Sequence, residues 1–298
     1  MSALRDTSPD FVYSLHNAGF GGVYYYPSRR LDAAYALLHQ IPHELGLVLS
    51  LGEPEMPWAV EWAPAVYRIP SVRDAYDYHA QYASGNPVEH IAGGGSSWDY
   101  LTSFRAPDRL PTVLITELPY FQSPDISDQT PTTETKGAVI LSGVERTRDM
   151  LDALSGLLAE VSGEVVQGTR LMRAFSSFVA YQSKSIESKR TWAKEAPGMS
   201  QPATVAQRAD EFYVKTYYKV LMASMLNRAL AAHLQTQRAP AVIDAQQRLE
   251  RWLTTWLSDV ESHLCYTAIP TRTLVQAQYG AMLAVMGHID AFEFRSDG

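Results

Sequence analysis

The spacing of apolar residues changes partway along the chain, and this change constrains the fold more than any other feature of the sequence. After residue 144, apolar side chains recur in successive stripes with the spacing of amphipathic helices. Before residue 129, short β-branched and aromatic runs alternate with polar segments, which is typical of an α/β domain. The segment between them is rich in Ser, Thr, Pro and Asp. We therefore predict an α/β domain over 1–128, a linker over 129–143 and a helical bundle over 144–298.

The overall charge and the cysteine content narrow the classes of function. The chain has 298 residues and a net charge of −7, whereas binding to nucleic acid phosphates needs a basic face. Cys265 is the only cysteine, so an internal disulfide is excluded and a reducing compartment is favoured. The sequence has no leader-like apolar segment at its start and no uninterrupted apolar run of about 18 residues. We expect a cytoplasmic protein with no nucleic acid or membrane partner.

Two polar residues, His16 and Glu117, lie next to predicted strands. The run at 11–13 predicts a buried strand before His16, and the glycines that follow allow the backbone to crowd behind the ring. The run at 111–116 predicts a second strand that ends at Glu117. Burial would raise the pKa of a carboxyl at that position, which suits a general base. The alternatives are a packed or surface histidine and a helix-capping or salt-bridged glutamate.

Other candidate residues lie in predicted helices and loops. His39 and His43 are four positions apart, a spacing that could bind a metal on one helix, but the proline between them is expected to end that helix. Glu53 and Glu55 flank a proline, and they either line a site or belong to a rigid surface loop. The Lys/Arg-rich run at 184–194 is expected to form a solvated helix face.

Three motifs occur in order along the first half of the chain. They are Ser14-Leu15-His16-Asn17, then Gly94-Gly95-Ser96 leading to Asp99-Tyr100, and finally Thr116-Glu117-Leu118. In this order they resemble the C-terminal half of the catalytic domain of the zinc carboxypeptidase family (carboxypeptidase A-like metallopeptidases), over roughly residues 8–125. The resemblance implies a partial mixed-sheet α/β domain, followed by an all-helical C-terminal region as in a bacterial subgroup of the family.

The resemblance also implies roles for individual residues. His16 takes the position of a zinc ligand, and Glu117 takes that of the general base. The positions that correspond to the substrate-binding region are Asn17, Tyr82, His90, Gly94 and Ser96. Zinc in such a site polarises a peptide carbonyl and lowers the pKa of its bound water, and the carboxylate takes the proton of that water. The implied function is zinc-dependent hydrolysis of a C-terminal peptide or amide bond by the complete protein.

The sequence departs from the family where the other zinc ligands are expected. The family's His-x-x-Glu pair lies upstream of the third ligand, but the segment before His16 contains neither histidine nor glutamate. We expect weak or absent zinc binding by this chain alone and no peptidase turnover. Replacement ligands, if present, would be drawn from His39, His43, His90 and Glu53.

The absence of that upstream half also has consequences for partners. The missing strands would leave an open sheet edge and an apolar face, which favours self-association or a complementing N-terminal chain. The alternative function is that of an inactive remnant that acts as a protein-interaction module through its helical half.

Overall fold

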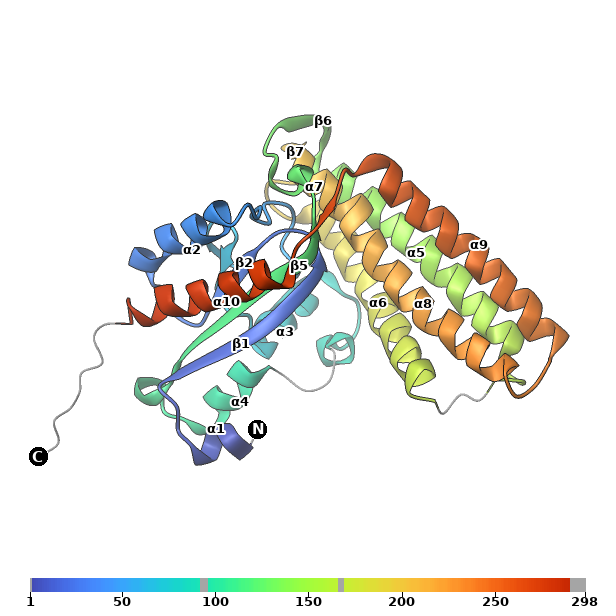
Figure 1. Cartoon of the computed structure of the whole chain (residues 1–298), viewed down its shortest axis with the longest axis horizontal. Helices are drawn as coiled ribbons and strands as arrows, with labels where there is room; N and C mark the ends of the chain where they lie inside the picture. The colour runs from blue at the N-terminus through green and yellow to red at the C-terminus, as the bar shows by residue number, and fades with distance from the viewer. Residues whose placement is uncertain (1, 92–95, 166–168, 290–298) are drawn as a thin grey trace, which may run out of the picture. The chain divides into compact units, whose positions relative to one another are not determined.

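The computed structural model describes residues 2–91, 96–165 and 169–289, and it shows a mixed α/β protein (Figure 1). The chain forms two compact units. Unit 1 comprises Met1–Gln81, Pro87–Gln129 and Tyr266–Gly298, and unit 2 comprises Tyr82–Asn86 and Thr130–Cys265. No helix within the described ranges is both long and apolar enough to cross a membrane.

The main element of unit 1 is a mixed sheet with β5 at its centre. Its strands are β1 (Phe11–Phe20), β2 (Tyr24–Pro27), β3 (Glu61–Ala63), β4 (Val66–Tyr67), β5 (Thr112–Gln122) and β8 (Thr267–Ala268). They follow the order β1-β5-β2-β4-β3, and β8 pairs with the end of β5. β1 runs parallel to β5, whereas β2 runs antiparallel to it. The residues of β5 from Thr112 to Pro119 are all buried, as expected for a strand that is covered on both faces.

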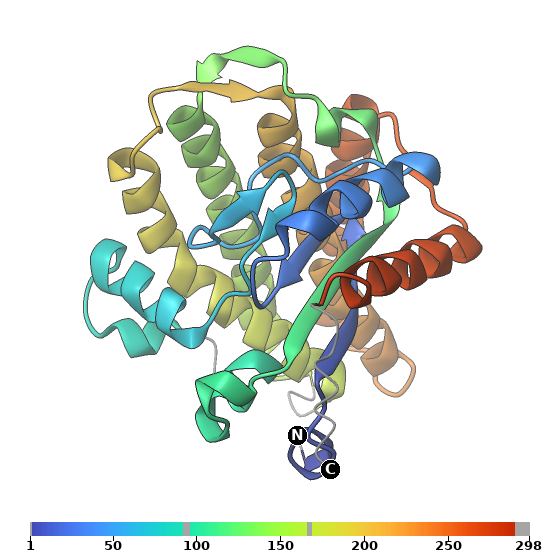
Figure 2. The same cartoon turned by 90° about the vertical axis from the view of Figure 1, so that its left-hand side faces the viewer.

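Helices cover both faces of this sheet. On one face α2 (Asp32–Glu44) and α10 (Thr271–Met286) pack against Leu114 and Leu118 of β5, and Figure 2 shows α10, in red, lying across β5, in green. On the other face α4 (Ser97–Phe104) packs against Val113 and Ile115. The side chains of β5 alternate between the two clusters because successive residues of a strand point to opposite faces. The other helices of this region are α1 (Ser2–Asp6), α3 (Val72–Tyr82) and the 3-10 helices η1 (Pro87–His90), η2 (Pro107–Arg109) and η3 (Pro124–Ser127).

Helix α2 continues through Pro42, where the sequence predicts that it ends. Proline has no N–H, so the carbonyl of Leu38, four residues earlier, loses its helical donor. The hydroxyl of Tyr25 donates to this Leu38 carbonyl oxygen at 2.8 Å instead. The strand β2 thus satisfies the group that the proline leaves open, and the helix extends to Glu44.

Unit 2 consists mainly of helices, which confirms the predicted helical region. The long helices are α5 (Lys136–Val161), α6 (Arg170–Glu195), α8 (Lys215–Leu234) and α9 (Pro240–His263). Their shared core includes Leu154, Phe175, Leu226 and Leu249. Before α8 the chain forms the short helix α7 (Val205–Ala209) and a π-helical turn, η4 (Asp210–Val214).

The structure differs from the predicted domain boundaries at both ends of this region. In the segment predicted to be a linker, β6 (Pro131–Thr135) pairs with β7 (Pro202–Thr204), and α5 begins at Lys136. The Thr135 hydroxyl caps α5 by accepting a hydrogen bond from the Ala138 N–H at 3.2 Å. At the other end, α10 packs on the sheet of unit 1 and is not part of the helical unit. An amphipathic stripe fits either surface, so its spacing alone does not select the partner.

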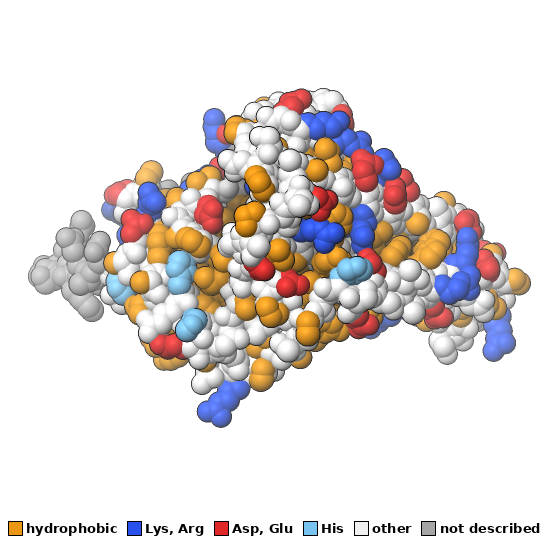
Figure 3. Space-filling view, turned by 90° about the horizontal axis from the view of Figure 1, so that it is seen from above, with side chains coloured by type: hydrophobic (Ala, Val, Ile, Leu, Met, Phe, Trp, Pro, Cys, Tyr) orange, Lys and Arg blue, Asp and Glu red, His pale blue; other side chains and the backbone are white. Residues whose placement is uncertain are grey.

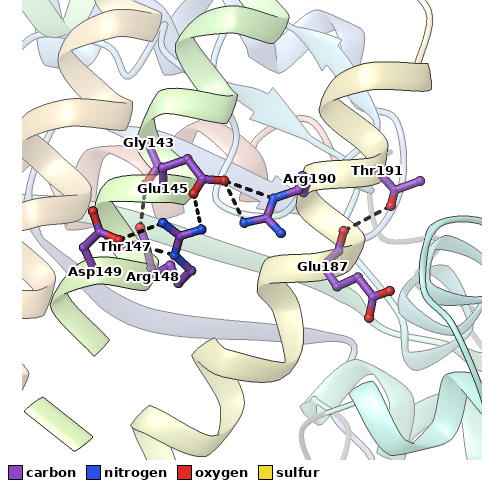
Figure 4. A network of polar contacts seen from close by, with 8 residues as sticks. All are labelled: Gly143, Glu145, Thr147, Arg148, Asp149, Glu187, Arg190 and Thr191. Carbon is purple, nitrogen blue, oxygen red and sulfur yellow. Dashed lines mark hydrogen bonds and ion pairs between the residues drawn. The ribbon is translucent and has the colours of Figure 1, made fainter. Parts of the chain in front are cut away.

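A polar network joins α5 to α6 on the surface of unit 2 (Figure 4). Glu145 of α5 accepts a hydrogen bond from Arg190 of α6, with 2.7 Å between Oε1 and Nη2, and it pairs with Arg148 at 2.5 Å. The Glu145 side chain is 41% exposed. Water therefore screens these ion pairs and limits the contribution of each to about 1 kcal/mol or less.

A second polar network lies inside unit 2 and includes one residue of the run at 184–194. Lys189 of α6 donates to Glu211 Oε1 at 2.7 Å, and Lys215 forms an ion pair with the same carboxylate. The Glu211 side chain is only 1% exposed. Gly143 of α5 makes room for it, because a Cβ at this position would lie 2.5 Å from Glu211 Oε2. The prediction that the run is a solvated face is therefore wrong at Lys189.

Candidate active site

His16 and Glu117 face each other on neighbouring strands. The sequence predicts that each residue follows a strand, but both lie within one, His16 in β1 and Glu117 in β5. In the parallel register of these strands the two residues are direct partners, so their side chains leave the same face of the sheet. His16 Nδ1 lies 2.8 Å from Glu117 Oε1, although the residues are 101 positions apart in the sequence. The structure thus brings the two principal site predictions together.

Ser14 places a hydroxyl against the second ring nitrogen of His16. It lies two positions earlier on the same strand and therefore on the same face, with Oγ 3.2 Å from His16 Nε2. These partners select one tautomer, in which Nδ1–H donates to the Glu117 carboxylate and Nε2 accepts from the Ser14 hydroxyl. The His16 side chain is 46% exposed and that of Glu117 is 10% exposed. Solvent can therefore reach the ring while the carboxyl is largely shielded.

The surroundings of Glu117 make its ionised form costly. Burial is the main cause that raises its pKa, and the negative charge of Glu55 raises it further. His16 acts in the opposite direction, through its charge and its hydrogen bond to the carboxylate. Tyr24, which pairs with Glu117 across β2 and β5, donates to Glu55 Oε2 at 3.3 Å. At neutral pH the protonated form of Glu117 is therefore less far above the ionised form in free energy than it is for a solvated glutamate.

The other predicted substrate-binding residues have different positions. Asn17 follows His16 on β1, and its Nδ2 donates to the Leu118 carbonyl at 3.4 Å. Ser96 caps α4 by accepting from the Asp99 N–H at 3.2 Å. His90 stacks on His79, with 5.2 Å between the ring centroids. Tyr82 packs against an apolar cluster of unit 2, and Gly94 lies outside the described residues. Among these residues, only Asn17 is adjacent in sequence to the pair of His16 and Glu117.

The donors near His16 do not make up a complete zinc site. Within the parts of the chain that the structure describes, no three side chains of His, Cys, Asp or Glu are grouped so that they could hold a metal ion. Of the candidate replacement ligands, His39 is bonded to the Pro64 carbonyl, with 2.8 Å between Nε2 and the oxygen. Zinc sites in proteins use at least three protein ligands. His16 and Glu117 therefore supply at most part of one.

Ser14 and Tyr24 received no role in the sequence analysis. The signal for Ser14 was available, because residues at positions i and i+2 of a strand share a face and His16 was already a candidate. Tyr24 was not recognisable, because its proximity to Glu117 depends on the antiparallel pairing of β2 with the distant β5. For Glu55 the sequence leaves two interpretations open, a residue that lines a site or one on a rigid surface loop, and the structure places it beside this group through Tyr24.

Comparisons of the chain with protein-family models, with curated protein sequences and with solved structures find no match. The relationship to zinc carboxypeptidases therefore stays a prediction from the three motifs. The fold that the structure shows is mixed α/β with a helical C-terminal region.

Proposed function

We propose that unit 1 carries the proton-transfer centre of a hydrolase that cleaves a peptide or amide bond at the C-terminal end of its substrate. The observation that carries this proposal is the 2.8 Å contact between His16 Nδ1 and Glu117 Oε1. The resemblance assigns both residues to one catalytic centre, and they come from two distant motifs. That these motifs meet as direct partners in the sheet supports a shared role.

Glu117 acts as the general base in this proposal. Its raised pKa strengthens the carboxylate as a proton acceptor. The carboxylate takes a proton from a water molecule as the water oxygen bonds to the scissile carbonyl carbon. When the carbon–nitrogen bond breaks, Glu117 returns this proton to the leaving amine. His16 holds the carboxylate through the hydrogen bond to Oε1 and presents its ring to solvent.

Zinc is the metal that the resemblance implies, and His16 is the residue that would bind it. Two donors, hydrogen-bonded to each other, do not satisfy a zinc ion. We therefore propose that this chain binds zinc weakly by itself and does not turn over peptides. Further donors, from another segment or a complementing chain, would have to join His16 before the complete centre forms.

Zinc titration and peptide digestion test this proposal. Calorimetric titration of the wild type should show weak zinc binding that His16→Ala abolishes. His39→Ala is the matched control, because the His39 ring is bonded to the Pro64 carbonyl and its removal should leave zinc binding unchanged. Mass spectrometry of peptides incubated with the chain should show no release of the C-terminal residue. Zinc binding that survives His16→Ala, or release of that residue by the chain alone, would contradict the proposal.

A second candidate is an ester or amide hydrolase in which Ser14 is the nucleophile. Ser14 Oγ, the His16 ring and Glu117 lie in one line of hydrogen bonds of 3.2 and 2.8 Å, which is the order of a Ser-His-acid triad. In this scheme His16 takes the Ser14 proton as Oγ bonds to the carbonyl carbon, and it gives that proton to the leaving alcohol or amine when the bond from the carbonyl carbon to that group breaks. Water then hydrolyses the acyl ester on Ser14 and restores the hydroxyl. A fluorophosphonate should then label the wild type but not Ser14→Ala or His16→Ala. Absence of labelling in the wild type would reject this candidate and leave the water activated by Glu117.

A further inference from the structure

We propose that a second copy of this chain docks along the open edge of β1, so that two sheets join across a two-fold axis. β1 has 10 residues, and in the described part of the chain it pairs with β5 alone. Its other edge therefore presents backbone N–H and C=O groups to whatever lies beyond it. The group that satisfies such an edge fully is another strand.

The sequence of β1 lacks the features that usually protect an edge. Edge strands avoid association through charged side chains, prolines or bulges. Residues Phe11–Phe20 contain no charged residue and no proline. The register with β5 is irregular only after Asn17, so the stretch before it is regular and available for pairing. An antiparallel partner of the same sequence therefore meets no lysine, arginine, aspartate or glutamate there.

Helix α10 adds an exposed apolar stripe beside this edge. The stripe consists of Val275, Tyr279, Leu283 and Met286, which recur with helical spacing. The opposite side of α10 is buried against the sheet and α2, through residues such as Leu274 and Ala281. Helix α10 is therefore apolar on two sides, and the side that carries the stripe is exposed to solvent.

Contacts on either side of α10 show which way the stripe points. Gly280 faces α2, because a Cβ at this position would lie 3.2 Å from Ile41 Cγ2. Gln278 faces the strands, and its Nε2 donates to the His16 carbonyl at 3.2 Å. Because successive helical residues turn by about 100°, Tyr279 points away from α2. The stripe therefore lies on the same side of α10 as the open edge of β1.

Leu15 connects the edge to the stripe. Tyr13 and Leu15 share a face of β1, and the Tyr13 hydroxyl donates to the Gln278 carbonyl at 2.7 Å, so this is the face that α10 covers. The Leu15 side chain is nevertheless 65% exposed. The edge, Leu15 and the stripe thus form one apolar surface, which we call the β1–α10 surface. It lies on the opposite face from His16 and Glu117, so docking there leaves their side chains accessible.

A second copy fits the β1–α10 surface better than a charged partner does. Between Thr273 and Met286 the helix has no charged residue, and neither has β1, so the surface offers nothing for a charged partner to pair with. On the face drawn in Figure 3, acidic and basic side chains are mixed. A two-fold arrangement places β1 against β1 and the α10 stripe against its own copy, which is the isologous contact that closes a dimer.

Sedimentation velocity of the full chain, from about 1 to about 100 µM, tests the proposal by mass action. The wild type should sediment as a dimer at the upper end of this range. Leu15→Lys and Val275→Lys should each weaken dimerisation about tenfold or more, because they bury a charge at the contact. Val88→Lys is the matched control: Val88 is 59% exposed and Val275 is 61% exposed, but Val88 lies on η1. Far-UV circular dichroism should show all three variants folded.

Hydrogen exchange provides a second measurement that does not depend on a variant. Amides of β1 should exchange more slowly at high than at low protein concentration, whereas those of unit 2 should not change. A chain that is monomeric at about 100 µM would overturn the proposal and leave the edge for a strand of another protein. A dimer that tolerates both Leu15→Lys and Val275→Lys would overturn it too, because the contact would then lie on another surface.

Discussion

Glu117 in unit 1 and Glu211 in unit 2 are both buried glutamates, yet their surroundings move their pKa values in opposite directions. Glu117 has the His16 ring as its partner and the carboxylate of Glu55 nearby, and its pKa is raised. Glu211 is bonded to Lys189 and Lys215, and its pKa falls from 4.5 to about 2. Burial raises the pKa in both cases, so the partners decide the outcome.

The opposite pKa shifts indicate different roles for the two residues. Glu117 can exchange a proton, whereas Glu211 stabilises the folded structure as a charged group. Two lysines lower the pKa of Glu211 to about 2, so near neutral pH it is a fixed negative charge. Burial lowers the pKa of Lys189 at the same time, since an ammonium also loses its hydration in this core. Glu117 has no lysine or arginine among the charges that shift its pKa, and its carboxyl can change state at a smaller free-energy cost.

The largest expected effect is that of Glu211→Gln on stability. The substitution takes the carboxylate away from Lys189 and leaves Lys215 with Asp210, 3.0 Å from its Nζ, as its acidic partner. We expect the free energy of unfolding to fall by about 3–5 kcal/mol, which is the usual cost of removing one member of a buried ion pair. Urea unfolding followed by circular dichroism measures the loss. A decrease in the free energy of unfolding below about 1 kcal/mol would mean that water screens the ion pairs of Glu211. Glu211 would then not differ from Glu117 as a structural charge.

The next effect concerns the space that Gly143 leaves for Glu211. In Gly143→Ala the new methyl group would clash with Glu211 Oε2 at 2.5 Å, and we expect a loss of about 1–3 kcal/mol. The matched control is Gly156→Ala on the same helix, where a Cβ meets nothing within 4 Å. That change should stabilise the protein by about 0.5–1 kcal/mol, because alanine favours the helix. In a Glu211→Ala background the cost of Gly143→Ala should largely disappear, and an unchanged cost would place the clash elsewhere.

The pH dependence of stability should have opposite signs for the two glutamates. The stabilisation from Glu211 is present above pH 4.5 and is lost as the pH falls towards about 2. Glu117 has a raised pKa, so its stabilisation is fully present below pH 4.5 and is lost as the pH rises through that raised value. Urea unfolding of the wild type, Glu211→Gln and Glu117→Gln over a series of pH values gives both differences. If the contributions of both glutamates to the free energy of unfolding changed in the same direction with pH, the proposed difference between Glu117 and Glu211 would be contradicted.

At neutral pH, Glu117→Gln should change the free energy of unfolding by no more than about 1 kcal/mol. The amide oxygen can still accept from the His16 ring, and the substitution removes a carboxylate whose ionised form is disfavoured by burial and by Glu55. Urea unfolding at pH 7 measures this change. A loss as large as that of Glu211→Gln would mean that Glu117 is also a structural charge.

The smallest effect is expected for Glu145→Gln. Like Glu211, Glu145 joins two cations, but its side chain is 41% exposed and its partners are Arg148 and Arg190. We expect a loss below about 1 kcal/mol that shrinks further in added salt. Unfolding at low and high ionic strength checks both statements, and a loss that is insensitive to salt would contradict them.

Local sequence patterns predicted those elements whose spacing is informative by itself. The helices of unit 2 follow from stripes of apolar residues, and β5 follows from a β-branched run. The partners of an element are not encoded in its spacing. The stripe of α10 looks like the others but packs on the sheet of unit 1, and β6 is a strand only because β7 pairs with it.

The candidate site shows the same limit. The resemblance identified His16 and Glu117 separately. The two-residue period of a strand would also have placed Ser14 on the same face as His16. The influence of Glu55 on Glu117 depends on the fold, because Tyr24 and Glu55 reach this face only through the pairing of β2 with β5. In unit 2 the partner of Lys189 was hidden for a similar reason, since the apolar spacing from Phe212 onward predicts a helix but not the π-helical turn on which Glu211 lies.

The most direct test of the proton-transfer centre is a carbon-13 NMR titration of the Glu117 carboxyl. The wild type should titrate above 4.5, since burial and Glu55 both raise the pKa. Glu55→Gln should lower that pKa, whereas His16→Ala should raise it further, because the ring is the group that lowers it. A Glu117 pKa at or below 4.5 that neither substitution changes would contradict the account.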